Sequence, residues 1–274
     1  MTAPLPQPLL TVLTPSLDAA TTLADTLASV AAAAAALQAR GATLEHWILD
    51  GGSTDGTAEL VEAHRAQRPW CRWATGLGGG PYGAMNAGLE RAMGHYVHVL
   101  NADDILLEPE AYGAAVLQAW QRQATVVLSS ISYFRRPQRQ LRHHWRVSPL
   151  PATAASWHGQ LRRGLHYPHP GFLAERGRYH GVGFDRRFRL SADYKMMQTL
   201  LLSTDPAGVL VVEQPLVAMA EGGASGQWSG IWRGTGELAR INRQLGIHQP
   251  LWDRYLNKLL MRLRGRAWPV SKAS

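Results

Sequence analysis

Short apolar runs alternate with longer segments of helical character through the first half of the chain. Runs of strand length, rich in β-forming residues, lie at residues 9–13, 46–49, 71–75, 96–100 and 125–128. Between them, composition predicts helices at residues 18–41, 57–68, 84–92 and 109–122. Because strands and helices alternate in this order, the sequence predicts an α/β fold with a parallel, doubly wound sheet.

The pattern changes after residue 132. Arginines and histidines crowd residues 135–146, as is typical of an exposed hairpin, and residues 149–155 have the composition of a loop. A helix is predicted from Ser191, because apolar residues follow it at helical spacing. The remaining predicted elements are two late strands and two final helices, at residues 209–212, 216–219, 231–245 and 251–264.

Composition limits the cellular setting. The chain has 274 residues, and 46% of them are hydrophobic, which is ample for a globular core. Cys71 is the single cysteine, so no internal disulfide can form and a reducing compartment fits best. Neither a membrane-spanning apolar run nor a secretory signal pattern is present. We therefore expect a cytoplasmic protein.

The net charge of +8 and the pI of about 10.0 suit an anionic partner: nucleic acid, anionic lipid or a phosphorylated small molecule. Basic residues and tryptophans alternate with leucines in residues 252–268, which suggests an amphipathic helix docked on the inner face of an anionic membrane. A helix packed on the core, with a solvated basic face, explains the same pattern equally well. The basic segment 135–146 raises a non-catalytic nucleic-acid-binding function, but the chain has no helix-turn-helix, RNP or zinc pattern. No nucleic acid partner is expected.

Asp50 stands at the end of the second predicted strand, directly before Gly51 and Gly52. Ligands of open α/β sheets bind at the carboxyl ends of the strands, where a carboxylate can accept hydrogen bonds from a base or ribose. A helix cap with a glycine turn accounts for Ser53 and Asp55 but leaves Asp50 unexplained. The turn has neither the P-loop nor the dinucleotide-binding glycine pattern.

Two adjacent acids, Asp103 and Asp104, follow the strand at residues 96–100. Neighbouring carboxylates repel each other, and a divalent cation between them and a polyphosphate relieves that repulsion. The alternative is an Asx-rich loop that caps the helix beginning near Pro109. Both interpretations fit the local sequence.

Two further features carry candidate chemistry. Residues 76–83 form a glycine-rich loop before a predicted helix, whose backbone amides could meet a phosphate or could simply belong to a mobile loop. Asp193 lies in the first turn of a predicted helix and on the face of its apolar residues. An ionised, inward-facing acid suits a general base, although N-terminal capping is the simpler role for this residue.

Taken together, these segments resemble the family 2 glycosyltransferases of bacterial surface-polysaccharide assembly. The matching stretches are TPSLD, LDGGSTDGT, YGAMNAGLERAMGHYVHVLNADD, HPGFLAERGRYHGVGFDRRFRLSADYKMM and EGGAS, in this order over about residues 9–226. The resemblance implies a GT-A (Rossmann-like) fold, a mostly parallel sheet flanked by helices. The GT-A domain would span residues 1–226, with a nucleotide-binding half at about 9–130 and an acceptor half at about 131–226. A C-terminal helical extension would follow at residues 227–274.

The same resemblance implies roles for individual residues. Asp193 would be the general base toward the acceptor hydroxyl, and Asp104 the ligand of a Mn²⁺ or Mg²⁺ ion. Asp50 would contact the base or ribose of the donor. The remaining implied residues are Thr14, Pro15, Gly52, Ser53, Asn86 and Asp103 at the nucleotide, and His169 and Arg176 on the acceptor side. The chain departs from the family pattern at Gly78 and Gly83, where relatives carry acids, and at Asp18, which replaces a common asparagine.

The implied reaction is an inverting transfer from a nucleotide-diphosphate sugar to a hydroxyl of a saccharide or lipid-linked acceptor. A nucleotidyltransferase would also use paired acids and a metal, but it would leave the Asp193 segment without a role.

Overall fold

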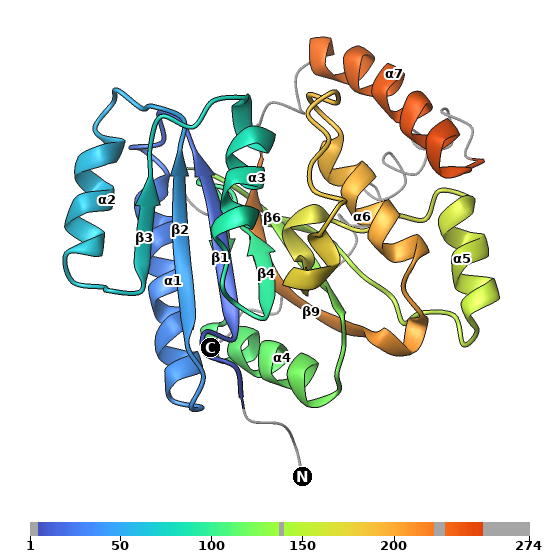
Figure 1. Ribbon diagram of the computed structural model, residues 1–274, viewed down its shortest axis with the longest axis horizontal. Coiled ribbons are helices and arrows are strands. Elements are labelled where there is room, and N and C mark those ends of the chain that lie inside the picture. The colour runs from blue at the N-terminus through green and yellow to red at the C-terminus, as the bar shows by residue number, and fades with distance from the viewer. Residues whose placement is uncertain (1–4, 137–139, 222–227, 249–274) are drawn as a thin grey trace.

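One continuous sheet forms the centre of the computed structural model, which describes residues 5–136, 140–221 and 228–248 (Figure 1). The strand order is β3-β2-β1-β4-β8-β6-β9-β5, and β7 pairs with β6 outside this path. The strands are β1 (Leu10–Ser16), β2 (Leu44–Asp50), β3 (Cys71–Ala74), β4 (Tyr96–Val99), β5 (Ile105–Leu106), β6 (Val126–Arg135), β7 (Gln140–Trp145), β8 (Phe172–Glu175) and β9 (Val209–Ala220). The α-helices are α1 (Leu23–Gln38), α2 (Thr57–Arg65), α3 (Gly80–Arg91), α4 (Pro109–Gln121), α5 (Ala154–Arg162), α6 (Ala192–Leu202) and α7 (Trp228–Leu245).

The first half of the sheet is parallel, as predicted. β1 pairs with β2 and β4, and β2 pairs with β3, all in parallel register. Ser16 lies opposite Asp50, so β1 and β2 end at the same level. The arrows of these strands point to the upper edge of the molecule in Figure 1, where α3 and α6 begin. This carboxyl edge is where a ligand site is expected.

The second half of the sheet mixes strand directions. β8 runs antiparallel to both β4 and β6, whereas β6 and β9 are parallel. β9 is one strand where the sequence predicts two, because the chain stays extended between Val212 and Leu216 while its register against β6 shifts near Ser130. The predicted hairpin after residue 132 is confirmed as the antiparallel pair of β6 and β7.

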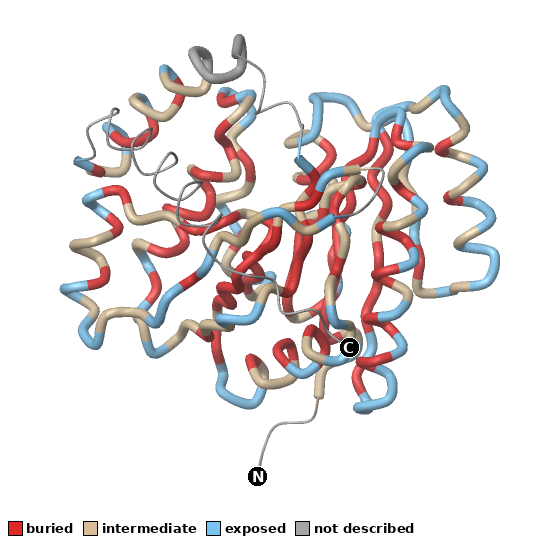
Figure 2. Tube along the Cα trace, turned by 180° about the vertical axis from the view of Figure 1, so that it is seen from behind, coloured by how far each residue is buried: buried red, intermediate tan, exposed pale blue. Residues whose placement is uncertain are grey.

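Helices cover both faces of the sheet and bury two apolar layers. α1 and α4 pack on one face around Val30, Leu37 and Val116. α3, α5, α6 and α7 cover the other face around Met85, Trp157 and Met197. Figure 2 shows the strands between these layers as an almost unbroken buried region. The α/β class and the GT-A architecture are therefore confirmed.

The structure extends the predicted helices of the C-terminal part. α7 begins at Trp228, earlier than the predicted residue 231, and it contacts α6 through Tyr194 and Asn242. α5 was not predicted, because its sequence reads as a continuation of the preceding loop. The predicted helix at residues 251–264 lies outside the described residues. Within the described part of the chain, no helix is both long and apolar enough to cross a membrane.

Candidate active site

Asp50 ends β2 at the carboxyl edge, and its carboxylate organises the glycine turn that follows. Oδ2 accepts the backbone N–H of Gly52 at 2.9 Å and of Ser53 at 3.0 Å, together with the hydroxyl of Thr75 at 2.9 Å. Oδ1 accepts the hydroxyls of Ser53 and Ser16. The residue is 2% exposed. Most of the acceptor positions of the Asp50 carboxylate are therefore occupied by donors of the protein itself.

Burial alone would raise the pKa of Asp50, but the hydrogen bonds from Ser53, Thr75 and Gly52 outweigh it and lower the pKa below 3.8. The carboxylate is thus ionised at neutral pH. Gly52 adopts a left-handed φ of 100°, which explains why glycine occupies this position. Gly51 and Gly52 are exposed, so the turn itself presents backbone to a ligand.

The other predicted nucleotide residues of this region lie beside Asp50. Thr14 is buried on β1, where its hydroxyl pairs with Nε2 of His46 at 2.9 Å, and Pro15 follows it on the same strand. Ser53 accepts the backbone N–H of Asp18 at 2.8 Å, while Asp18 accepts that of Thr54 at 2.9 Å. These bonds connect the end of β1 to the glycine turn after β2.

The acid pair lies after β4 on the same edge, with β1 between it and Asp50. Asp104 is 1% exposed, and its oxygens accept the N–H of Ala220 and the amide of Asn101, each at 3.1 Å. Asp103 is more exposed than Asp104. The sequence predicts Asp104 as the direct metal ligand, and that assignment stays a prediction. In the structure Asp104 is the buried acid of the pair, and Asp103 is the more accessible one.

A basic side chain from the β6–β7 ribbon supports the acid pair. Arg136 donates to the carbonyl of Asp103 at 3.0 Å and to the carboxylate of Asp25 on α1 at 2.6 Å. Burial nevertheless raises the pKa of both Asp103 and Asp104, and the negative charge of Asp103 raises that of Asp104 further. The neighbouring guanidinium therefore does not fully compensate the two charges.

A divalent cation fits this unbalanced pair. The described residues contain no group of three or more His, Cys, Asp or Glu that could hold a metal without help. Mg²⁺, however, usually needs only one or two carboxylates when substrate phosphates supply further oxygens. Carboxylate oxygens also suit Mn²⁺. The residues after β4 therefore match an ion that is shared with a phosphorylated ligand.

Asp193 lies in the first turn of α6 and is partly buried. Its Oδ1 accepts the hydroxyl of Tyr82, from the first turn of α3, at 2.9 Å. Asp193 therefore sits next to the start of α3, where the glycine-rich loop after β3 ends. Leu77 of that loop donates its N–H to the carbonyl of Asp50 at 3.1 Å. This chain of contacts links Asp193 to Asp50 across one edge of the sheet.

His169 lies close to Asp193 in a short 3-10 helix, His169–Gly171. Burial lowers the pKa of His169, and the charge of Asp193 opposes that effect. The imidazole meets the ring of Phe184 edge-on, with centroids 6.1 Å apart. The predicted acceptor-side position of His169 therefore adjoins the predicted base.

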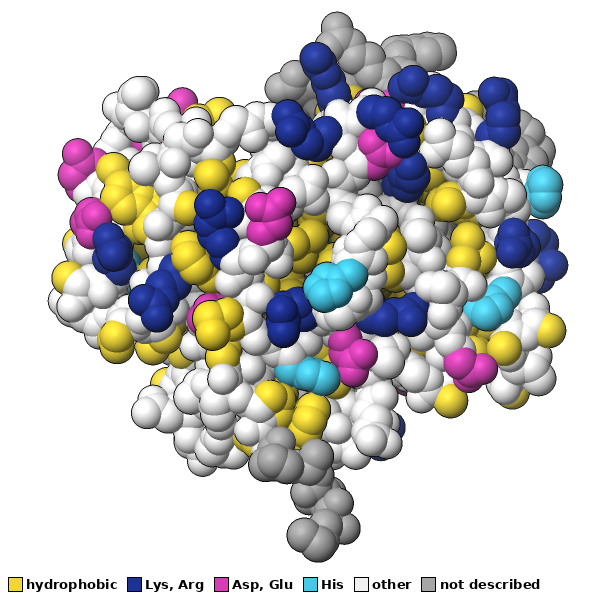
Figure 3. All heavy atoms as spheres, viewed as in Figure 1, with side chains coloured by type: hydrophobic (Ala, Val, Ile, Leu, Met, Phe, Trp, Pro, Cys, Tyr) yellow, Lys and Arg dark blue, Asp and Glu magenta, His cyan; other side chains and the backbone are white. Residues whose placement is uncertain are grey.

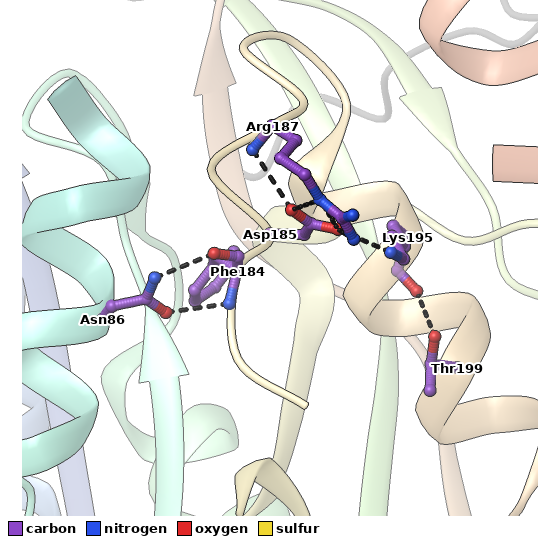
Figure 4. Close-up of polar contacts among 6 residues, drawn as sticks. All are labelled: Asn86, Phe184, Asp185, Arg187, Lys195 and Thr199. Carbon is purple, nitrogen blue, oxygen red and sulfur yellow. Dashed lines mark hydrogen bonds and ion pairs between the residues drawn. The ribbon is translucent and has the colours of Figure 1, made fainter. Parts of the chain in front are cut away.

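Asn86 holds the segment that leads to α6 (Figure 4). Its amide donates to the carbonyl of Phe184 and accepts the N–H of the same residue, both at 2.8 Å. Asn86 was expected at the nucleotide. The structure instead uses both polar ends of its side chain to join α3 to residue 184.

A salt-bridge cluster fixes the next residues of the same segment. Asp185 binds Arg187 at 2.7 Å and Lys195 of α6 at 2.6 Å (Figure 4). The hydrogen bond from Arg187 is the largest cause of a strongly lowered pKa of Asp185. Glu237 of α7 accepts the N–H groups of Arg189 and Leu190 at 2.8 and 2.9 Å. The approach to Asp193 is therefore held by α3, α6 and α7.

Arg176 does not belong to this site. β8 runs antiparallel to β4, with Glu175 opposite Tyr96, and Arg176 donates its N–H to the carbonyl of His95 at 2.8 Å. These contacts place Arg176 at the amino end of β4, the edge opposite the acid pair. β8 carries the chain from one edge of the sheet to the other between His169 and Arg176, so the structure separates Arg176 from His169 and Asp193.

The sequence did not predict three residues that hold parts of this site in place: Tyr82, Arg136 and Glu237. Each acts through a partner more than 30 residues away in the chain, at Asp193, Asp103 and the N–H groups of residues 189–190. Local spacing carries no signal for such contacts. The sequence shows that Tyr82 belongs to the glycine-rich loop, but it does not show that Tyr82 contacts Asp193.

Comparison with known proteins agrees with this arrangement. The family model described as "Glycosyl transferase family 2" matches residues 11–184. No curated protein matches the chain in sequence. Among solved structures, residues 1–349 of TarS from S. aureus in complex with UDP-GlcNAc superpose with a TM-score of 0.65 at 15% identity, covering 85% of this chain and 65% of that one.

Two further structures share the fold. The mannosyltransferase PcManGT from Pyrobaculum calidifontis, in complex with GDP-Man and Mn²⁺, gives a TM-score of 0.57 at 15% identity, over 85% of this chain and 64% of that one. Glucosyl-3-phosphoglycerate synthase from Mycobacterium tuberculosis, in complex with Mn²⁺, UDP and phosphoglyceric acid, gives 0.51 at 18% identity, over 96% and 80%. The chain spans slightly less than two thirds of TarS 1–349 and of PcManGT.

Proposed function

The chain belongs to glycosyl transferase family 2, and from this premise we propose that it transfers a sugar, with inversion, from a nucleotide-diphosphate donor to a hydroxyl group. The acceptor would be a saccharide or a lipid-linked sugar. One observation carries the proposal: Asp50, the Asp103–Asp104 pair and Asp193 lie at the same edge of the sheet, although they are far apart in sequence.

Asp193 is the proposed general base. It would take the proton of the acceptor hydroxyl while that oxygen attacks the anomeric carbon on the side opposite the leaving diphosphate. The sugar passes through an oxocarbenium-like transition state, as in glycoside hydrolysis. General-base assistance of this kind contributes about 10²- to 10⁴-fold. The adjacent His169 and Phe184 would line the acceptor side.

The donor nucleoside would lie on the glycine turn after β2. Asp50 would hold that turn in shape, with Thr14 and Pro15 of β1 beneath it and the exposed backbone of Gly52 and Ser53 available to the ligand. The bound UDP-GlcNAc and GDP-Man of TarS and PcManGT support a nucleotide-sugar donor for this chain.

Asp103, with Asp104 behind it, would hold a Mn²⁺ or Mg²⁺ ion. When bound, the cation would offset the charge that develops on the leaving nucleoside diphosphate. The Mn²⁺ in the complexes of two structural neighbours supports this choice of ion. Arg136 would keep the backbone of Asp103 in place.

The proposal is tested by incubating the full chain with Mn²⁺, UDP- and GDP-sugars, and a panel of octyl glycosides, and by measuring nucleoside diphosphate release and product stereochemistry. We expect turnover with at least one pair and an inverted anomeric centre. Asp193→Asn should abolish turnover and leave donor binding intact. Release of pyrophosphate from nucleoside triphosphates, without sugar transfer, would identify a nucleotidyltransferase instead.

A second experiment addresses the acid pair. Calorimetry with the donor nucleoside diphosphate, with Mn²⁺ or with EDTA, should show metal-dependent binding in the wild type. Asp103→Asn should remove that dependence. Equal binding by the wild type and Asp103→Asn would contradict the assignment of the ion to Asp103.

Docking on an anionic membrane would bring the enzyme to a lipid-linked acceptor. The basic, tryptophan-containing stretch that motivates this idea lies outside the described residues. Co-sedimentation with phosphatidylglycerol vesicles, comparing the full chain with a truncation after Gly246, tests it. If the full chain stays in the supernatant, the membrane-docking hypothesis is wrong.

A further inference from the structure

The first turns of α3 and α6 meet at one hydrogen bond. The hydroxyl of Tyr82, in the first turn of α3, donates to Oδ1 of Asp193, in the first turn of α6, at 2.9 Å. Among the described residues, the other oxygen, Oδ2, has no protein hydrogen-bond partner. One oxygen of this carboxylate is therefore held by the protein, and the other is free to meet a ligand.

The ring of Tyr82 is itself held in place. It stacks on Phe184 with centroids 5.7 Å apart and an interplanar angle of 13°. Asn86 lies four residues after Tyr82, on the same face of α3. It fixes the backbone of Phe184 through two hydrogen bonds of 2.8 Å. Tyr82 and Asn86 therefore both contact Phe184, and these contacts hold the Tyr82 side chain beside Asp193.

The segment on the other side of Asp193 is equally constrained. Lys195 and Arg187 bind Asp185, and Glu237 accepts the two N–H groups just before α6. The start of α6 cannot rotate without breaking these contacts. The position of the Asp193 side chain is then decided mainly by the one contact that its carboxylate makes.

We infer that Tyr82 is a positioning residue for the reaction: it holds Oδ1 of Asp193 and thereby directs Oδ2 toward the acceptor hydroxyl. The inference rests on the proposed role of Asp193 as the general base. A carboxylate oxygen that is fixed within hydrogen-bond reach of the nucleophile gains rate through orientation, and a misplacement of about 1 Å can cost about 10²-fold.

The chemistry of Tyr82 agrees with this role. Burial is the main cause of a strongly raised pKa of the Tyr82 hydroxyl, and the charge of Asp193 raises it further. The hydroxyl therefore keeps its proton at neutral pH. It therefore acts as a donor to Asp193 and does not take the acceptor proton itself.

Tyr82→Phe tests the inference, because phenylalanine keeps the stacking ring and removes only the hydroxyl. With the donor and octyl glycoside that give the fastest turnover in the wild type, we expect kcat to fall about 10- to 100-fold. The donor Kd from calorimetry and the acceptor KM should stay unchanged. A purely structural role would not produce this separation of kcat from binding.

Tyr96→Phe is the matched control. Tyr96 also donates a buried hydrogen bond, to the carbonyl of Ala124 at 2.7 Å, but it lies at the amino end of β4, away from the site. We expect its kcat to equal that of the wild type. If Tyr82→Phe also turns over at the wild-type rate, or if it loses donor binding, the positioning role is wrong.

Asp193→Asn separates this inference from the proposed function. An inactive Asp193→Asn together with a fully active Tyr82→Phe overturns the role of Tyr82 alone. An active Asp193→Asn overturns the assignment of the base, and the role of Tyr82 with it. Failure of the wild type to turn over any pair overturns both.

Discussion

The aspartates at the carboxyl edge of the sheet differ in what surrounds each carboxylate. Asp50 is enclosed by hydrogen-bond donors, which favour its charge. Asp104 is buried beside a second acid, which opposes its charge. Asp193 accepts the Tyr82 hydroxyl at one oxygen, and its other oxygen has no hydrogen-bond partner among the described residues. Environment, rather than residue type, therefore distinguishes the turn-forming Asp50 from the proposed metal-binding pair and the proposed base.

The structural task of Asp50 predicts a loss of stability when it is replaced. In Asp50→Asn, an NH₂ group replaces one of the two oxygens and the negative charge is lost, so the donors on one side of the carboxylate lose their charged acceptor, whichever way the amide turns. We expect the free energy of unfolding to fall by about 1–3 kcal/mol. Urea denaturation measures it, with Asp205→Asn as a control, because Asp205 accepts one N–H at an exposed turn. A residue that only contacts the nucleotide would leave the apo protein as stable as before.

Arg178 offers a second prediction at the scale of one side chain. Its guanidinium closes the C-terminal end of α6 by donating to the carbonyls of Leu200 and Ser203 and to the hydroxyl of Thr204, at 3.1, 3.2 and 2.6 Å. Arg178→Ala removes the charged donor from the Ser203 carbonyl and the Thr204 hydroxyl, whereas the Leu200 carbonyl keeps the hydroxyls of Ser203 and Thr204. We expect the substitution to cost about 1.5–3 kcal/mol of unfolding free energy.

Arg65→Ala is the comparison for Arg178. Arg65 pairs with Glu62 at 3.1 Å on the exposed face of α2. Such a pair contributes only about 0.3–0.5 kcal/mol. Thermal and urea unfolding of both variants should therefore separate clearly. Equal losses would mean that the Arg178 contacts add no more than a surface ion pair.

Individual site residues could be predicted where a local rule applies, and not where a partner is distant. Asp50, Asp103 and Asp104 follow strands, so the sheet rule placed them at the ligand edge. Arg176 lies seven residues after His169, and no local pattern revealed that the intervening segment is a strand running away from the site. The burial of Asp104 likewise depends on Ala220, which is distant in sequence.

At the scale of elements, the start of α3 explains a departure from the family pattern. α3 begins at Gly80, earlier than predicted, because Gly79 adopts a left-handed φ of 88° and Pro81 suits the first turn. A Cβ at Gly83 would lie 2.3 Å from the carbonyl oxygen of Gly78, whereas a Cβ at Gly78 meets nothing within 4 Å. The loop therefore has room for an acid at residue 78 and none at residue 83.

This difference predicts opposite outcomes for the two substitutions. Gly78→Asp should fold with wild-type stability. Gly83→Asp, and even Gly83→Ala, should lose about 1–3 kcal/mol through overpacking. Gly236→Ala in α7 is a control of opposite sign, with open space around its Cβ and an expected gain of about 0.4–1 kcal/mol. Urea unfolding of the four variants decides the order, and a stable Gly83→Asp would contradict it.

Elements with strong local signals were predicted, and those that depend on pairing were not. β1, β2 and β4 are buried almost throughout and contain short apolar runs, as buried parallel strands do, and these runs identified them in the sequence. β8 follows the turn-rich residues 166–171, and it is a strand because it fills the gap between β4 and β6. Pro215 interrupts the apolar pattern, so the sequence predicts two strands where the structure has one. β9 stays paired with β6 on both sides of Pro215, because the register between the two strands shifts at this point.

At the scale of the whole molecule, the face shown in Figure 3 carries a cluster of basic side chains. Lysine and arginine side chains gather at the upper right of Figure 3, on the side where α7 lies in Figure 1. Arg186, Arg187 and Arg189 are exposed in the segment just before α6. A positive surface raises the local concentration and the association rate of anionic ligands. The charge therefore suits the nucleotide-diphosphate donor that we propose for this chain.

Buried neutral histidines couple the stability of the whole chain to pH. His98 is fully buried between the hydroxyl of Tyr112 and the carbonyl of Pro170, at 2.8 and 2.9 Å, and burial lowers its pKa to about 4. In the unfolded chain it titrates near 6.5. Below pH 6.5 the unfolded state binds the proton more readily, so stability falls as the pH falls. Between pH 7 and pH 5 this costs about 2 kcal/mol.

A comparison of variants isolates the histidine, because the raised pKa values of Asp103 and Asp104 act in the opposite direction in every variant. His98→Gln should be less stable than the wild type at pH 7, since it perturbs the buried hydrogen bonds. The gap should shrink by about 2 kcal/mol at pH 5, because glutamine does not titrate. Urea unfolding at both pH values measures the change. A constant gap for His98→Gln would show that His98 is not kept neutral by burial.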